Sequence, residues 1–439
     1  MEQSQHYYAC HLAEVSKKNI VTLVEDVFND RGILVVKKGT EVDQAFAQKI
    51  AKHKLFKPLD QSISLTESLN QRTCLEFLIR RLEDMSLSYV ARKSGLLGEA
   101  SEAFHLLTQY PLITLKLTVL SERMPEVFGR ALITSVMVLG LCKELKLSTE
   151  TAGHVFLANV ISDIGLLHID PLVVNKKSKY SQDEWKLMQG HVIIAKHFAD
   201  MVPNLSKTVG QAVIESHERA DGFGYPFAKH FSHLGVEGQV LAIVGKVNAL
   251  SDKLVLQGPH SWTSVIAVMQ VPSTAHVSKI HNGMMRLLKR LPFKYKAAFS
   301  GLQFTQLVTL CIEKRERLEL WFKEFARIYV DHKSLMTDSE HFRPLSLLHK
   351  LEYTVDDTGV LNPTQHEWLT SLLTTLSVSD FSEIEEFALI LDEVEYQCLF
   401  VMRELVSGKD ELAKRFNGKE LPDLYYQGLM NILAPEEAN

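Results

Sequence analysis

The spacing of apolar residues constrains the fold of this chain more than any other feature of its sequence. From about residue 70 onward, nearly every segment places apolar side chains three or four residues apart, which is the period of a helix with one buried face. Leu75, Leu78, Leu82 and Met85 form one such series. The pattern predicts a mainly α protein, with helices at 183–199, 205–218, 238–253, 280–291, 302–330, 365–376, 382–405 and 423–433.

The first 60 residues follow a different pattern. Residues 19–38 hold two short apolar stretches separated by a turn that contains Gly32, and this predicts a β-hairpin. Beyond the hairpin, the helical spacing of Phe46 and Ile50 predicts one helix.

Two stretches are expected to separate domains. Residues 60–67 are polar and rich in serine, and residues 254–275 contain glycine and proline breakers. The expected organisation is a small α+β module at 1–62, a helical bundle at 70–258 and a C-terminal helical domain at 273–439.

Composition excludes several classes of protein. Lys and Arg number 48 against 53 Asp and Glu, so no overall basic field is available to bind nucleic acid. No apolar run approaches the roughly 20 residues of a membrane-spanning helix, and the first 18 residues lack the apolar core of a secretory signal. The five cysteines are far apart, which indicates neither a disulfide framework nor a thiolate zinc site. We expect a cytoplasmic protein with no membrane span and no nucleic-acid partner.

Histidine is concentrated in one region and raises the question of a metal site. Seven of the 18 histidines lie between residues 154 and 233, and most of them are expected to be ordinary surface or core residues. Three positions have more informative surroundings. Asp163 ends an apolar helix just before Gly165, His191 lies in a predicted helix, and His217 precedes a loop rich in glycine and aromatic residues.

The loop that follows His217 carries a recognisable motif. It reads Asp-Gly-Phe-Gly-Tyr-Pro at 221–226, and it is preceded in order by Asp163, His191 and the His217-Glu218-Arg219 triplet. These residues, within about 110–255, resemble the HD-GYP family. That family is a branch of the HD phosphohydrolases that hydrolyse the bacterial second messenger cyclic di-GMP with two or three metals in a helical bundle. The N-terminal module is similar to a small domain often found ahead of such bundles.

The resemblance also implies where ligands and partners bind. The expected metal ligands are Asp163, His191 and His217. Cyclic di-GMP and the GGDEF-domain proteins that make it are the expected partners. The loop that would meet a nucleotide or a partner contains Arg219, Asp221, Gly222, Gly224, Tyr225 and Pro226.

Four of the seven ligand positions that the family implies hold residues unsuited to a metal. An early His, the His of the HD pair, the first of two adjacent His and a late Asp are replaced here by Arg130, Ser162, Ser216 and Gly245. Leu166 also stands where the family has a lysine.

This loss affects the two metal positions unequally. One position keeps only Asp163 of four ligands, whereas the other keeps Asp163, His191 and His217. The expected content is therefore either no metal or a single Fe, Mn or Zn ion, since two His and one carboxylate bind such ions. His154 lies nine residues before Asp163 and points to the opposite side of the helix, so it does not replace a lost ligand. For His168 the question stays open.

Each of these residues also has a purely structural interpretation. Asp163 would cap the turn at Gly165, and the two His would pack in an inherited core. Arg130 would be a surface or salt-bridging residue, or a cation that fills the emptied metal position and pairs with Asp163. The motif loop would serve only to form a tight turn that covers the pocket. Alternatively, it would be a surface that binds partner proteins, and Arg219 and Tyr225 would hold a nucleotide.

Three functions remain open from the sequence. The leading prediction is a catalytically inactive or weakened relative of cyclic di-GMP phosphodiesterases that acts in bacterial signalling. The alternatives are an active metal-dependent phosphodiesterase with a rearranged site, and a helical adaptor with no link to nucleotides. Residues 273–439 carry no motif that decides between them. Their charged runs at 313–317 and 383–395 predict solvent-exposed helix faces, and the aromatic residues at 321–329 predict core.

Overall fold

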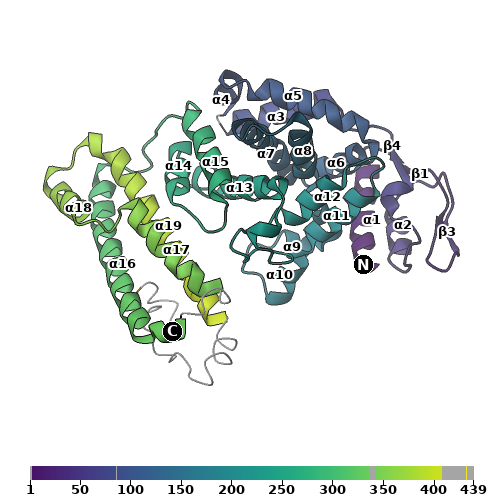
Figure 1. The fold of residues 1–439 in the computed structure, drawn as a ribbon. Helices are drawn as coiled ribbons and strands as arrows, with labels where there is room; N and C mark the ends of the chain where they lie inside the picture. Colours follow the sequence, from purple (N-terminus) through teal and green to yellow (C-terminus); the bar gives the residue numbers. More distant parts are fainter. Residues whose placement is uncertain (1, 86, 337–342, 408–431, 433–439) are drawn as a thin grey trace. The chain divides into compact units, whose positions relative to one another are not determined.

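The computed structural model describes residues 2–85, 87–336, 343–407 and 432, and within them the fold is mainly α, as predicted. Figure 1 labels the elements. Short 3₁₀ or π segments are η1 (Leu59–Gln61), η2 (Leu107–Gln109), η3 (Ile164–His168), η4 (Phe231–His233), η5 (Asp252–Leu256) and η7 (Val378–Asp380). The strands are β1 (Val21–Leu23), β2 (Val27–Phe28), β3 (Leu34–Val36) and β4 (Ile63–Leu65).

The helices account for most of the described chain. The helix predicted at 423–433 lies outside the described residues except for residue 432. The others are α1 (Glu2–Ser16), α2 (Gln44–Ile50), α3 (Gln71–Asp84), α4 (Ser88–Lys93), α5 (Leu96–Leu106), α6 (Pro111–Arg123), α7 (Pro125–Glu144), α8 (Thr149–Ile161), α9 (Pro171–Val174), α10 (Gln182–Gln189), α11 (His191–Met201), α12 (Lys207–Glu215), α13 (Val236–Ser251), α14 (Trp262–Gln270), α15 (Ser278–Arg290), α16 (Gly301–Met336), α17 (Arg343–Thr358), α18 (Pro363–Thr375) and α19 (Phe381–Ser407).

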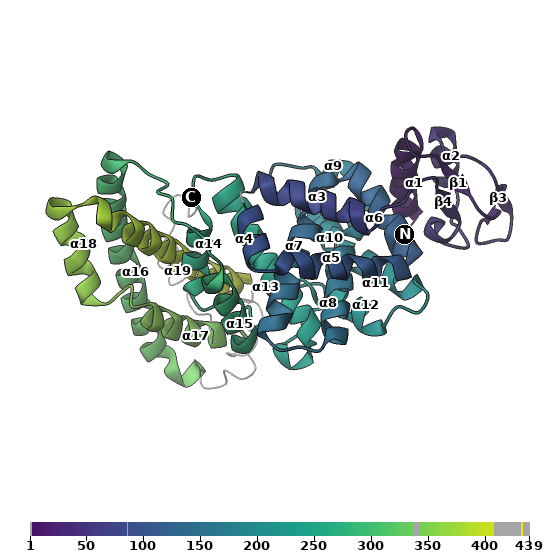
Figure 2. The same cartoon turned by 90° about the horizontal axis from the view of Figure 1, so that it is seen from above.

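Contacts divide the chain into two compact units. The first contains residues 1–248 and 277–287, and the second contains residues 249–276 and 288–439. The N-terminal module belongs to the first unit, where α1, α2 and the strands lie together at one end in both views (Figures 1 and 2).

The N-terminal module contains the predicted hairpin and two elements that the sequence did not predict. β2 pairs antiparallel with β3, and the turn between them places Gly32 at a φ of 75°. The stretch expected as a joint, 60–67, contains β4 and most of η1, and β4 pairs antiparallel with β1. The sequence also did not predict α1. This helix packs against α2, α6 and η3 and buries Tyr8, Leu12 and other apolar side chains.

The bundle of the first unit is built around α7. By length and composition α7 is the one described helix apolar enough to cross a membrane, yet 78% of its apolar window is buried, as in the core helix of a soluble protein. Asn159 on α8 is buried and donates to the Ala131 carbonyl and to Ser135 Oγ, which ties α8 to α7. The single helix predicted at 183–199 is two helices, α10 and α11, that meet at Gly190.

In the second unit the stretch predicted as a break contains a helix, and the two charged runs are exposed only in part. Residues 254–275 contain α14, whose buried Trp262, Val265 and Val268 pack against α19. Within the charged runs Arg315 is buried and donates to the Leu361 carbonyl, and Glu385 is buried and accepts from the Ala298 amide. A hydrogen-bonded backbone partner offsets the desolvation of each charge, which a pattern of charges alone does not reveal.

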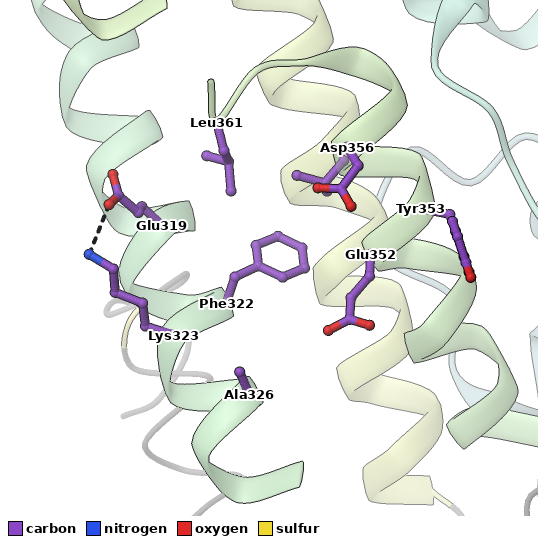
Figure 3. Close-up of a pocket in the computed structure, with 9 residues that line it drawn as sticks. Glu319, Phe322, Lys323, Ala326, Glu352, Tyr353, Asp356 and Leu361 are labelled. Atoms are coloured by element: carbon purple, nitrogen blue, oxygen red, sulfur yellow. Dashed lines mark ion pairs between the residues drawn. The ribbon is translucent and has the colours of Figure 1, made fainter. Parts of the chain in front are cut away.

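The aromatic residues of α16 are mostly core, as predicted. Trp321 and Phe325 are buried. Phe322 is half-buried and faces an open cavity of about 590 Å³ that also lies within the second unit (Figure 3). The cavity has an acidic rim and is lined by Glu319, Phe322, Lys323, Ala326, Glu352, Tyr353, Val355, Asp356 and Leu361.

A buried histidine in the first unit predicts how stability depends on pH. His11 of α1 is buried, accepts a hydrogen bond from Arg123 Nε at 3.3 Å, and has its pKa lowered to about 4, first by burial and then by the charges of Arg123 and Lys116. Between pH 6.5 and 4 the unfolded chain therefore binds a proton that the folded chain does not. Stability is lost as the pH falls through this window.

We expect the wild-type free energy of unfolding to fall by up to about 3 kcal/mol more than that of His11→Gln over this window. Gln cannot titrate but still offers an acceptor to Arg123. Denaturant unfolding at several pH values measures the difference. If the free energy of unfolding depends on pH in the same way for the two proteins, the prediction is contradicted.

Candidate metal centre

Asp163, His191 and His217 come together in the first unit. One ligand atom from each residue lies within 4.8 Å of the other two, and no other group of three potential ligands of this kind occurs in the described part of the chain. Asp163 lies between α8 and η3, His191 begins α11, and His217 follows the end of α12. The three residues that the sequence predicted as ligands are therefore neighbours in space.

A close backbone contact brings Asp163 to His191. A Cβ at Gly165 would lie 2.0 Å from the His191 carbonyl oxygen, so only glycine lets η3 approach α11 this closely. Asp163 Oδ1 then lies 3.6 Å from His191 Nε2. Asp163 makes no side-chain capping bond to η3, so the capping role considered from the sequence is not found.

His191 turns its Nε2 atom toward Asp163. The ring is 5% exposed, and its Nδ1 lies 2.6 Å from the Met188 carbonyl oxygen. A carbonyl can only accept, so Nδ1 carries a proton, and in the neutral ring Nε2 keeps its lone pair. Nε2 is buried without a hydrogen-bond partner. This tautomer and orientation are those of a metal-ligating histidine.

His217 is neutral at physiological pH. Burial first, and then the neighbouring His191 and Arg130, lower its pKa to about 4, while Asp163 opposes them. Tyr225 stacks on the His217 ring, with centroids 4.7 Å apart and planes at 10°. Trp185 meets the other edge of Tyr225 at 5.8 Å between centroids. An aromatic wall therefore covers one side of the three candidate ligands.

The motif loop folds back on the end of α12. Gly222 has a φ of 80°, and a Cβ at Gly224 would lie 2.3 Å from the Arg219 amide nitrogen, so both positions require glycine. Arg219 donates to both carboxylate oxygens of Asp221, at 3.0 and 2.7 Å. The loop closes with a cis peptide bond before Pro226.

Glu218 organises this loop, a role that sequence reasoning missed. Its buried carboxylate accepts from the backbone amides of Phe227 and Lys229, at 2.7 and 2.9 Å. Its position directly after His217 was visible in the sequence. Its burial depends on the return of the loop, which no local pattern encodes.

The positions predicted to have lost their ligands do not supply substitutes. Ser162 Oγ donates to the Asn159 carbonyl at 3.0 Å, and Ser216 Oγ donates to the Val213 carbonyl at 2.8 Å, so each hydroxyl bonds back to its own helix. Gly245 on α13 has no side chain, and a Cβ there would meet no atom within 4 Å. The His168 question is also answered: His168 is buried against Lys116 and lies outside the cluster.

The three side chains fit one divalent ion. Ligand atoms at about 2.1 Å from a common ion lie at most about 4.2 Å apart. The cluster is only slightly wider than this, so small side-chain rotations would close it. Neutral imidazole nitrogens and one carboxylate suit Fe, Mn or Zn and leave coordination positions open.

Comparison with known proteins shows what this region of the chain is similar to. Residues 114–277 match the HD domain family. This region is an HD domain. The chain is 28% identical over 135 residues to a 3′3′-cGAMP-specific phosphodiesterase of Vibrio cholerae, a match that covers 30% of each chain. It is 23% identical over 183 residues to a cyclic di-GMP phosphodiesterase of Pseudomonas aeruginosa, covering 41% of this chain and 42% of the relative.

These matches confirm the resemblance to the HD-GYP branch of the HD superfamily. A cyclic di-GMP phosphodiesterase response regulator of Xanthomonas campestris is 30% identical over 115 residues, which is 26% of this chain and 30% of the relative. The chain thus spans less than half the length of each of these three relatives. The loss of metal ligands stays a prediction.

The Gly165 contact gives a test of how the HD domain positions Asp163. Gly165→Ala would force the added methyl against a backbone oxygen, so we expect a loss of about 1–3 kcal/mol in the free energy of unfolding. Gly98→Ala on α5 is the control, because a Cβ at Gly98 meets no atom within 4 Å and alanine favours a helix. Denaturant unfolding measures both variants. Equal stability of Gly165→Ala and wild type would show that the contact is not tight.

Proposed function

We propose that this HD domain holds one divalent metal between Asp163, His191 and His217 and binds a cyclic dinucleotide beside it, with hydrolysis weakened or lost. The observation that carries the proposal is the asymmetry of the site. Three candidate ligands converge, whereas the hydroxyls at two other ligand positions are bonded to their own helices. On this proposal the protein acts in bacterial cytoplasmic signalling as a nucleotide-responsive or scaffolding protein.

The nucleotide class follows from the chemistry of the site and its relatives. The relatives act, by their names, on cyclic di-GMP or 3′3′-cGAMP, which share two phosphodiesters and a guanine base. In this chain Arg130 places a positive charge close enough to depress the pKa of His217. Trp185, 44% exposed beside Tyr225, offers an aromatic surface on which a base can stack.

Weak hydrolysis follows from the number of metals. Phosphodiester cleavage at a two-metal site uses one ion to make a hydroxide nucleophile and another to take the charge on the leaving oxygen. Here the residues support one ion. Arg130 would oppose negative charge on a phosphate but cannot ligate a metal or activate a water.

The motif loop is the proposed surface for protein partners. Phe227 and Phe231, directly after the motif, are 60% and 49% exposed. Exposed aromatic side chains are enriched in protein interfaces. GGDEF-domain proteins are the proposed partners, because they would supply the nucleotide that the HD domain binds.

An active phosphodiesterase is the second candidate. It is favoured by the converged ligand set itself, because His217 is in the neutral form that binds metal and Nε2 of His191 has no hydrogen-bond partner. A single ion with open positions would lower the pKa of a bound water. The adaptor with no nucleotide is the outcome if neither metal nor nucleotide binds.

Metal content tests the centre directly. We expect about one metal per chain in wild-type protein purified without chelators, from the three-ligand stoichiometry. Asp163→Ala, His191→Ala and His217→Ala should hold close to none, because each removes one of three ligands. His154→Ala is the matched control, since this histidine lies outside the cluster, and it should keep its metal. Mass spectrometry of Fe, Mn and Zn gives the numbers.

Each other result has a clear meaning. Two or more metals in the wild-type chain would contradict the single-metal site and favour the active enzyme. No metal would contradict the centre itself. Calorimetry with cyclic di-GMP and with 3′3′-cGAMP, followed by chromatography of the products, then separates binding from cleavage.

Restoring the lost ligands tests the weakened-site interpretation. Ser162→His, Ser216→His and Gly245→Asp together should add a second metal and raise the rate of nucleotide hydrolysis. The Gly245 position has room for a side chain. The control replaces the same three residues with Ala. If the restored variant holds no more metal than this control, the loss of these ligands is not the reason that the site holds only one metal.

A further inference from the structure

The first unit encloses a buried charge that the metal centre does not use. Lys116 on α6 is 1% exposed, and its Nζ lies 2.7 Å from Asp60 Oδ1 and 2.8 Å from His168 Nε2. The same ammonium lies 3.2 Å from the centroid of the Tyr8 ring, and Tyr8 stacks on His168 at 4.7 Å. Side chains from α1, η1, α6 and η3 therefore surround one lysine.

The charges of this cluster depend on each other. Burial lowers the pKa of Lys116 to about 8, with Asp60 opposing that shift. Burial alone would raise the pKa of Asp60, but the charges of Lys116 and His168 and the hydrogen bonds from Lys116 and Tyr8 together outweigh burial, and the pKa is lowered. Buried ion pairs of this kind often contribute little net stability compared with apolar residues of similar size. The cluster is therefore a candidate for holding elements in a specific arrangement.

The cluster contacts the segment that begins at Asp163 and ends at His168. His168 is the last residue of η3, and Asp163 immediately precedes its first residue. At Gly165 the segment packs against the backbone of α11, and at His168 it is held by Lys116 and Tyr8. Asp163 therefore belongs to a short segment fixed on two sides, by the bundle and by the N-terminal module.

We propose that Lys116 is a positioning residue for the metal centre, which fixes η3 through His168 and so sets the place of Asp163. This inference rests on the proposed single-metal site. It also assigns the N-terminal module a part in building that site, because Tyr8 and Asp60 complete the cluster. Residues that orient metal ligands typically alter metal affinity by about 10–100-fold when they are removed.

The test uses the full chain and three variants. Lys116→Met alone would leave the Asp60 carboxylate buried without its cation, which risks unfolding. Lys116→Met with Asp60→Leu removes both charges at similar volume, and His168→Phe keeps an aromatic ring on Tyr8 but loses the bond to Lys116. The control, Lys143→Met, removes an ion pair with Glu99 between α7 and α5 and leaves η3 untouched.

The first measurement needs no metal. Amide hydrogen exchange of peptides covering residues 160–170 should become about tenfold faster in both cluster variants, because the segment opens locally more often. Exchange in Lys143→Met should match wild type. Unchanged exchange in both cluster variants, with folding intact by circular dichroism, would overturn the inference.

The second measurement is the affinity for Mn²⁺ by calorimetry. We expect binding about 10–100-fold weaker in the cluster variants than in wild type and in Lys143→Met. Wild-type affinity in the folded cluster variants would overturn the inference while leaving the proposed function intact. If wild-type protein fails to bind manganese or any other divalent ion, the proposed function fails, and the exchange measurement alone then decides whether Lys116 holds the segment.

Discussion

The approach of η3 to the backbone of α11 is the contact on which the site depends. Because Gly165 has no side chain, the carbonyl of His191 can lie where a Cβ would otherwise stand. This places Asp163 beside the one nitrogen of His191 that is left without a hydrogen-bond partner. Without that contact the three candidate ligands would lie in separate parts of the helical bundle and could not bind the same metal ion.

A small number of charged groups near the three candidate ligands determines the electrostatic potential of the site. The His217 imidazole stays neutral, chiefly through desolvation, and the Asp163 carboxylate supplies negative charge. Arg130 adds a positive charge where the HD-GYP resemblance implies a ligand. A cation at this place balances part of the charge that a second metal would balance, but it brings no open coordination position for a water. On the proposed function, this difference is why the site would bind a phosphodiester but cleave it weakly or not at all.

The N-terminal module and the bundle share a buried polar interface. Lys116 bridges Asp60 and His168 there, and Tyr7 of α1 donates to Asp170 beyond η3 at 3.1 Å. Polar contacts of this kind fix one arrangement because a displaced partner would leave a charge buried and unpaired. The segment that carries Asp163 therefore takes its position from a module distant from it in sequence.

The sequence by itself determined the mainly α fold, the hairpin at Gly32 and the three residues that converge, because apolar period, turn glycines and motif order are local signals. It did not predict α1, β4 or α14, nor the burial of Arg315, Glu385 and Lys116. Those features depend on partners far along the chain: β1 pairs with β4, and Lys116 with Asp60. Only the tertiary structure decided them, because the free energy of burying a strand edge or a charge is set by what packs against it.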